Sequence, residues 1–110
     1  MFIGGIGDGP DPVIGIARYL ISSGIGHVPF TNAEAYNNSQ VDMLFNLAAV
    51  TTNTTQRYSY FEQIQKVVTA DLPVVWLFSD SYPTAWTTSV HGMPLGPWSD
   101  SEPMTNVWLG

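Results

Sequence analysis

SQVDMLFNLAAVTTNTTQRYSYFEQIQKVVTADLP, residues 39–73, carries the strongest helical pattern in the sequence. Its first half places apolar residues at the spacing of one helix face: Val41, Leu44, Phe45 and Ala48. The tetrapeptide Ser39–Asp42 resembles a capping box, in which a serine and an acidic residue three positions later satisfy the first amides of a helix. These residues predict a helix that begins near Ser39.

A second helix is predicted over about 54–70. Asn53 is placed to cap it, with Gln56 three residues later as the reciprocal partner. Three apolar residues share one side of this helix: Phe61, Ile64 and Val68. The helix is expected to end at Leu72-Pro73, because a proline disfavours the helical conformation in the residue before it.

Upstream, residues 11–24 predict a further helix that ends near Gly24. Asp11 is expected to be its N-cap, and Pro12 lies in the first turn, where its missing amide hydrogen costs nothing. The apolar face of this helix would consist of Val13, Ile16, Ala17 and Leu20. The following segment, residues 24–38, is rich in glycine, proline and asparagine and is predicted to be a loop.

Two short apolar segments indicate β-strands. Val74–Phe78 is continuously apolar, as expected for a strand covered on both faces, and Met1–Ile3 precedes a glycine-rich turn. Two strands make a poor sheet by themselves. The expected fold class is therefore α/β, with helices packed on a small, incomplete sheet. After Ser79 a loop-dominated tail rich in proline, glycine, serine and tryptophan is expected.

Composition excludes several functions. Nine acidic and three basic side chains give a net charge of −6, which argues against a surface that binds nucleic acid. The chain has no cysteine, so it has neither disulfides nor thiolate metal sites. Its histidines, His27 and His91, lack metal-ligand spacing and are expected to be ordinary loop residues. No apolar run is long enough to span a bilayer, and the start lacks a signal-peptide layout, so an exported protein would carry its leader elsewhere.

The glycine-rich segment GGIGDGPDP, residues 4–12, is unusual enough to suggest a binding loop. It is not a dinucleotide fingerprint, because Pro10 stands where the third glycine is required. Asp8 and Asp11 could form a carboxylate pair for acid–base chemistry. On composition alone, Asp8 is better interpreted as a turn residue that bonds its own backbone, and Asp11 as a helix cap.

The tryptophans have two interpretations. They could form a stacking surface for sugars or for a partner, or they could pack in the core and in interfaces, which is favoured for Trp76. The residues concerned are Trp76, Trp86, Trp98 and Trp108.

The order of features along the chain resembles the C-terminal part of the peptide- and nickel-binding proteins of ABC importers, solute-binding protein family 5. The resemblance covers residues from Phe2 to about Gly96. It is carried by Gly4, Asp8, Asp11 and Pro12, then Tyr36-Asn37-Asn38 with Val41-Asp42, then Arg57, Tyr60 and Gln65, then Leu72-Pro73-Val74, and finally Val90 and Gly92. Members of this family are several times longer, so the chain resembles a fragment of one.

The resemblance implies a two-lobed periplasmic binding protein of type II, which closes around a solute and delivers it to the membrane subunits of an ABC permease. It implies no catalysis and no cofactor. Residues 1–71 would belong to the C-terminal lobe, with the ligand-cleft loop and three helices. Residues 72–110 would form a crossover strand and an aromatic tail that returns towards the other lobe.

The resemblance also assigns binding residues. In peptide-binding members, the aspartate matched by Asp8 pairs with the α-ammonium group of the ligand, and the backbone matched by Ile6 and Gly7 contacts the peptide. Gly5 stands where many members carry a tryptophan that walls the pocket. Ligand size therefore stays open, as does the choice among peptides, nickel complexes and oligosaccharides.

Several other residues are expected to support the fold and not to contact the ligand. Scaffold roles are expected for Tyr36, Asp42, Arg57 and Gln65, with Arg57 donating a structural ion pair. A fragment of a larger sheet would expose apolar surface, so self-association is expected.

One alternative is a self-standing interaction module whose aromatic tail binds a protein or a glycan. The other is a small hydrolase that uses Asp8 and Asp11.

Overall fold

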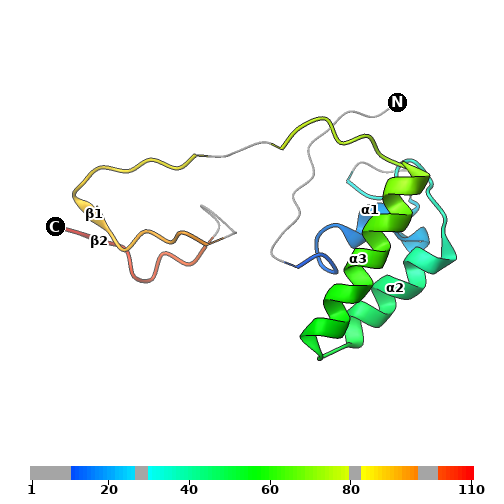
Figure 1. Ribbon diagram of the computed structural model, residues 1–110. Coiled ribbons are helices and arrows are strands. Elements are labelled where there is room, and N and C mark those ends of the chain that lie inside the picture. The colour runs from blue at the N-terminus through cyan, green and yellow to red at the C-terminus, as the bar shows by residue number, and fades with distance from the viewer. Residues whose placement is uncertain (1–10, 27–29, 80–82, 97–101) are drawn as a thin grey trace. The chain divides into compact units, whose positions relative to one another are not determined.

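The computed structural model describes residues 11–26, 30–79, 83–96 and 102–110 (Figure 1). The chain divides into two compact units, Met1–Trp76 and Leu77–Gly110. The described elements are α1 (Ala17–Leu20), the 3₁₀ turn η1 (Ser22–Gly24), α2 (Ser39–Val50), α3 (Thr54–Asp71), β1 (Val90–His91) and β2 (Trp108–Leu109). Within these ranges, no helix has both the length and the apolar character that crossing a bilayer requires.

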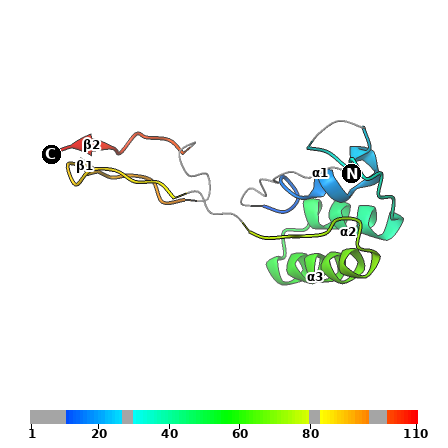
Figure 2. The same ribbon diagram turned by 90° about the horizontal axis from the view of Figure 1, so that it is seen from above.

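Helices α2 and α3 run side by side and are joined by a short connection (Figures 1 and 2). Asn53 caps α3 as predicted, since its side chain accepts a hydrogen bond from the Gln56 amide at 3.0 Å. The cap of α2 is Asn38 instead of Ser39, because the Asn38 side chain accepts from Gln40 and Val41. The helix begins at Ser39, as predicted, but its capping residue lies one position earlier than the predicted one.

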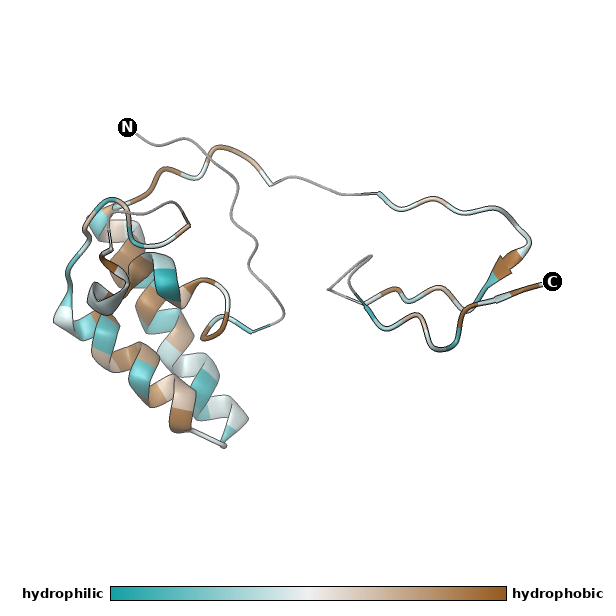
Figure 3. Cartoon of the chain, turned by 180° about the vertical axis from the view of Figure 1, so that it is seen from behind, coloured by the Kyte–Doolittle hydropathy of each residue, from teal (hydrophilic) through white to brown (hydrophobic). Residues whose placement is uncertain are grey.

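The core of the first unit lies where these helices meet α1. The predicted α2 face is confirmed in full, and Ile64 and Val68 of α3 are buried against it, while Phe61 is only partly buried. Figure 3 colours the chain by hydropathy, and apolar (brown) and hydrophilic (teal) residues alternate along the helices of this unit. The buried apolar residues are Ala17, Tyr19, Leu20, Val41, Leu44, Phe45, Ala48, Ile64 and Val68.

The predicted helix over 11–24 is broken into smaller pieces. Asp11 does not cap α1, whose N-cap is Ile16. Asp11 instead begins a separate turn, in which its backbone carbonyl accepts from the amides of Ile14 and Gly15. The chain bends at Ile21, between α1 and η1. The predicted apolar face still points inward, with Ala17 and Leu20 buried, because the turns preserve its approximate spacing.

The prediction of a β-strand at Val74–Phe78 is wrong. Helix α3 ends at Asp71, its C-cap Leu72 adopts the left-handed conformation with φ 47°, and the chain then continues without regular structure. An extended segment becomes a strand only when a neighbour accepts its backbone hydrogen bonds. No described segment pairs with these residues, and Phe78 is 83% exposed.

The second unit contains a small sheet that the sequence did not reveal. Strands β1 and β2 are antiparallel, with Val90 opposite Leu109 and His91 opposite Trp108. The His91 and Trp108 rings stack at a centroid distance of 4.1 Å. Gly92 has φ 70°, and a Cβ there would lie 2.1 Å from the Asn106 carbonyl oxygen, so this bend requires glycine.

The expected α/β class stays a prediction. The described residues of the first unit form helices and turns, and the other strand candidate, Met1–Ile3, lies outside the described residues.

Candidate functional site

An ion pair connects Asp11, near the end of the glycine-rich segment, to the helices. The Nη2 atom of Arg57 donates to both carboxylate oxygens of Asp11, at 2.9 and 2.8 Å, as the predicted structural ion pair requires. The Nε atom of Arg57 donates to the Ala48 carbonyl oxygen at 2.8 Å, and the guanidinium lies 5.1 Å from the centre of the Phe61 ring. Arg57 therefore links Asp11 to the end of α2 and to α3.

Asp11 is held as a carboxylate. A hydrogen bond from the Val13 amide lowers its pKa, and Arg57 lowers it further through a hydrogen bond and charge attraction, against a partial opposing effect of burial. Both oxygens are engaged with these partners. An ionised carboxylate in this state is a poor proton donor, which weakens the hydrolase alternative that required Asp8 and Asp11 together.

The residues that the resemblance assigns to the ligand, Gly5, Ile6, Gly7 and Asp8, lie outside the described residues. The first described residue after them is Asp11.

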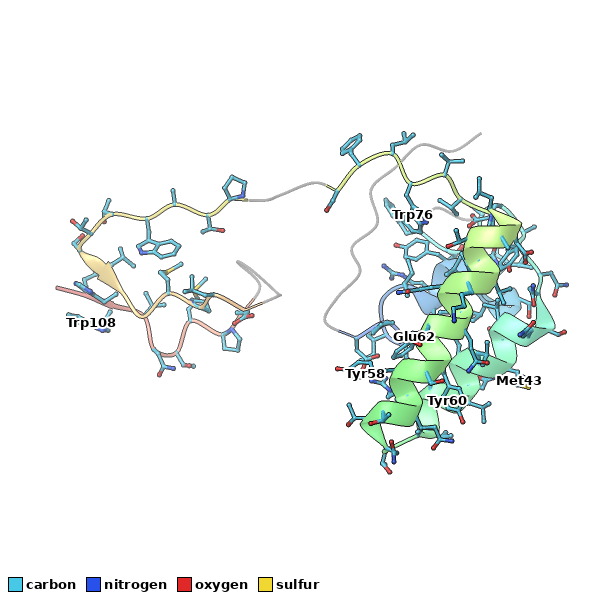
Figure 4. The ribbon with its side chains drawn as sticks, viewed as in Figure 1. Met43, Tyr58, Tyr60, Glu62, Trp76 and Trp108 are labelled. Atoms are coloured by element: carbon cyan, nitrogen blue, oxygen red, sulfur yellow. The ribbon has the colours of Figure 1, made fainter. Side chains whose placement is uncertain are left out.

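An apolar groove of about 450 Å³ opens on the same unit. Gln65, which was expected to be scaffold, and Thr69 are its polar residues, and Trp76 forms part of its wall near α3 (Figure 4). The other lining residues are Pro12, Ile16, Leu20, Phe45, Phe61, Ile64 and Val68. Trp76 is 57% exposed, so it borders the groove without belonging to the core that was favoured for it.

The loop before α2 is organised around Asn32, which is fully buried. Its Nδ2 atom donates to the carbonyl oxygens of Ile21 and Tyr36, at 2.9 and 2.7 Å, and its Oδ1 atom accepts from the Tyr36 amide at 2.8 Å. Sequence reasoning missed Asn32, because asparagine is common in solvent-exposed turns and no local pattern marks the buried one.

Two more of the expected scaffold residues also make long-range contacts. Asp42 accepts from both the backbone amide and the hydroxyl of Ser22, which explains why it does not act in a capping box. The Tyr36 hydroxyl donates to Asp71 at 2.6 Å, and the Asn38 side chain donates to the same carboxylate oxygen at 2.8 Å. These bonds fasten the loop to the ends of α2 and α3.

Tyr36 gives the fold a predictable sensitivity to alkali. Burial, together with the hydrogen bond to Asp71 and the negative charge of Asp71, raises the pKa of Tyr36 to about 12 from 10.0. Because the folded pKa is raised, this contribution to the free energy of unfolding is complete below pH 10.0 and is lost as the pH rises to about 12.

Urea denaturation across this range of pH should show a smaller loss in the free energy of unfolding for Tyr36→Phe than for the unmodified chain. Tyr58→Phe, an exposed site on α3, is the control, and equal losses in all three proteins would contradict the prediction.

The remaining candidate residues are the two histidines and the other tryptophans. Among the described residues, no group of three or more His, Cys, Asp or Glu side chains is arranged to hold a metal ion. His91 stacks on Trp108, whereas His27 and Trp98 lie outside the described ranges. Trp86 and Trp108 are 44% and 58% exposed.

Comparison with known proteins gives one partial similarity. Over 66 residues, or 60% of the chain, the sequence is 39% identical to the "Probable D,D-dipeptide-binding periplasmic protein DdpA" of Escherichia coli strain K12. The matched region spans only 13% of that protein, which is named as a binding protein and not as an enzyme. No family model matches the chain, and no solved structure matches it.

Proposed function

We propose that this chain is part of an extracytoplasmic solute-binding protein of an ABC importer, and that its solute is a dipeptide or a related small peptide. The observation that carries the proposal is the 39% identity to a periplasmic dipeptide-binding protein. The order of residues along the chain, described above, supports the same family. In this proposal the protein binds and delivers, catalyses no reaction and needs no cofactor.

Asp8 is the proposed partner of the ligand's α-ammonium group, with Gly5, Ile6 and Gly7 supplying backbone that approaches the peptide closely. A carboxylate shielded from water forms a strong, charge-assisted hydrogen bond with an ammonium group. Asp11, the next acidic residue, is already engaged by Arg57 and by the Val13 amide. This leaves Asp8 as the proposed anchor in the segment.

Calorimetric titration of the binding protein of which this chain is proposed to be a part tests this role. We expect it to bind D-alanyl-D-alanine or L-alanyl-L-alanine, and to lose binding to the N-acetylated forms, which carry no ammonium charge. Asp8→Asn should weaken the dipeptide complex by about 10- to 100-fold, because a hydrogen bond to a charged group contributes roughly 1.5–3 kcal/mol.

Glu62→Gln is the matched control, since it removes one negative charge from the exposed surface of α3 (Figure 4). If Asp8→Asn and Glu62→Gln have the same affinity, Asp8 is not the anchor. If the unmodified protein binds the free and the acetylated dipeptides equally, recognition of the α-ammonium group is excluded.

A second candidate function is self-association or binding to a protein or glycan. It is favoured by one observation, the run of exposed apolar side chains after α3, where Val75, Trp76, Leu77 and Phe78 are 64%, 57%, 69% and 83% exposed. Apolar patches of this kind commonly mark interfaces. Light scattering of the purified chain at tens of micromolar should then show species larger than a monomer. A single monomeric species would contradict self-association.

A further inference from the structure

We infer that the segment Val74–Phe78 pairs with the same segment of a second copy of the chain, as two antiparallel strands centred on Trp76. This inference deepens the second candidate function, self-association, and rests on it. The proposed binding of a dipeptide is independent of it.

The backbone of this segment has no partner among the described residues. Residues 73–79 make no backbone hydrogen bond to any residue that the structure describes, and they lie outside the helices and the β1–β2 sheet. A row of unpaired amide and carbonyl groups is a template on which another strand can form main-chain hydrogen bonds. Pro73 lacks an amide hydrogen, so it limits the length of such a ladder at one end.

The side chains of the segment suit a strand. All five are valine, leucine or aromatic, and none is charged: Val74, Val75, Trp76, Leu77 and Phe78. Valine and the aromatic residues favour strands. Because the segment is uncharged, pairing with a second copy places no like charges opposite each other. Four of the five side chains are exposed, so pairing removes apolar surface from water.

Pairing about Trp76 makes the segment complementary to itself. In this register Trp76 lies opposite Trp76 of the second copy, Val74 lies opposite Phe78, and Val75 lies opposite Leu77. Successive side chains of a strand point to opposite faces, so Val74, Trp76 and Phe78 share one face. Aromatic pairs and pairs of aromatic with β-branched residues on one face stabilise a sheet. The contact is two-fold symmetric and therefore joins two copies.

The area of this contact predicts a weak dimer. The exposed parts of Val75, Trp76, Leu77 and Phe78 on two copies together offer roughly 1,000 Å², since one large aromatic side chain can bury about 150–250 Å². Stable protein interfaces bury about 1,200–2,000 Å² in total. We therefore expect a dimer at tens of micromolar that dissociates on dilution to about 1 μM.

Light scattering of the full chain from about 1 to 100 μM, with two variants, tests the backbone ladder. Leu77→Pro stays apolar but removes an amide hydrogen and fixes φ, so this variant should remain monomeric throughout the range. Leu77→Ile is the matched control, because it keeps the amide, the size and the preference for strands, and it should form the dimer. Circular dichroism should show equal helix content in all three proteins, since Leu77 lies outside the helices.

Single cysteines test the orientation of the two strands, because the chain has no cysteine of its own. Trp76→Cys places each thiol opposite its counterpart, at a Cα separation that a disulfide can bridge. Ser79→Cys places the two thiols roughly 20 Å apart in the antiparallel pair and opposite each other only in a parallel pair. Mild oxidation should therefore cross-link the Trp76→Cys variant and leave the Ser79→Cys variant uncross-linked.

Three results would overturn the inference. A chain that is monomeric throughout the range would exclude self-association itself. If Leu77→Pro and Leu77→Ile associate equally, self-association stands but does not use a backbone ladder through this segment. Rapid cross-linking of the Ser79→Cys variant, or a mass that rises beyond two copies, would exclude the antiparallel two-fold pair. None of these results bears on the binding of a dipeptide.

Discussion

Asn32→Ala is expected to lower the free energy of unfolding of the first unit by about 3 kcal/mol or more. The substitution leaves three backbone groups without their partner: the carbonyl oxygens of Ile21 and Tyr36 and the amide of Tyr36. Each buried polar group that loses its hydrogen bond costs about 1–3 kcal/mol. Asn32 is 0% exposed, so water does not replace the missing side chain without opening the loop.

Urea denaturation followed by far-ultraviolet circular dichroism measures this loss. Asn46→Ala is the matched control, because Asn46 is exposed on α2, and a change of about 0.5 kcal/mol or less is expected there. Asn32→Asp separates the two ends of the amide, since it keeps an acceptor for Tyr36 and removes both donated bonds. A stable Asn32→Ala variant, unfolding at the same urea concentration as Asn46→Ala, would show that the loop does not depend on this residue.

Leu44→Ala should destabilise the same unit by about 2–5 kcal/mol, whereas Leu47→Ala should cost much less. Both leucines lie on α2, but Leu44 is 3% exposed in the core with Phe45 and Ile64, and Leu47 is 37% exposed. Shortening a buried leucine removes apolar contact and leaves a cavity that the close-packed surroundings fill only in part.

Both leucines lie on α2, and both variants remove the same side-chain atoms. The difference between their free energies of unfolding therefore reports how deeply each leucine is buried. The same denaturation experiment applies, with thermal unfolding as a second measurement. Equal destabilisation of the two variants would mean that the α2 face assigned to the core is wrong. A small unit has few other buried side chains to compensate, so Leu44→Ala is expected to leave it marginally folded.

Helical periodicity predicted most of the first unit. The spacing of Val41, Leu44, Phe45 and Ala48 identified the buried face of α2, and Asn53 was identified as the cap of α3. These features depend on residues three or four positions apart, so a local pattern is enough to reveal them. Arg57 was also expected to donate a structural ion pair, although its contact with Asp11 joins residues 46 positions apart.

The errors have a common physical cause. Val74–Phe78 has the composition of a buried strand, but a strand exists only with a neighbour, and composition does not supply one. The β1–β2 pair was missed for the converse reason, since two residues on each strand carry no periodicity. Asp42 has the residue type of a capping box but bonds Ser22, twenty positions earlier, which only the folded chain brings within reach.

The sequence by itself therefore determined α2, α3 and the apolar face of α2, because these follow from local spacing. Its resemblance to a binding-protein family named Asp8 as the proposed anchor, which the titration of Asp8→Asn tests. Only the tertiary structure decided that Asp11 is held by Arg57, that Asn32 is the buried centre of the loop and that Tyr36 is fastened to Asp71. These contacts join distant residues, and their existence depends on how the whole unit packs.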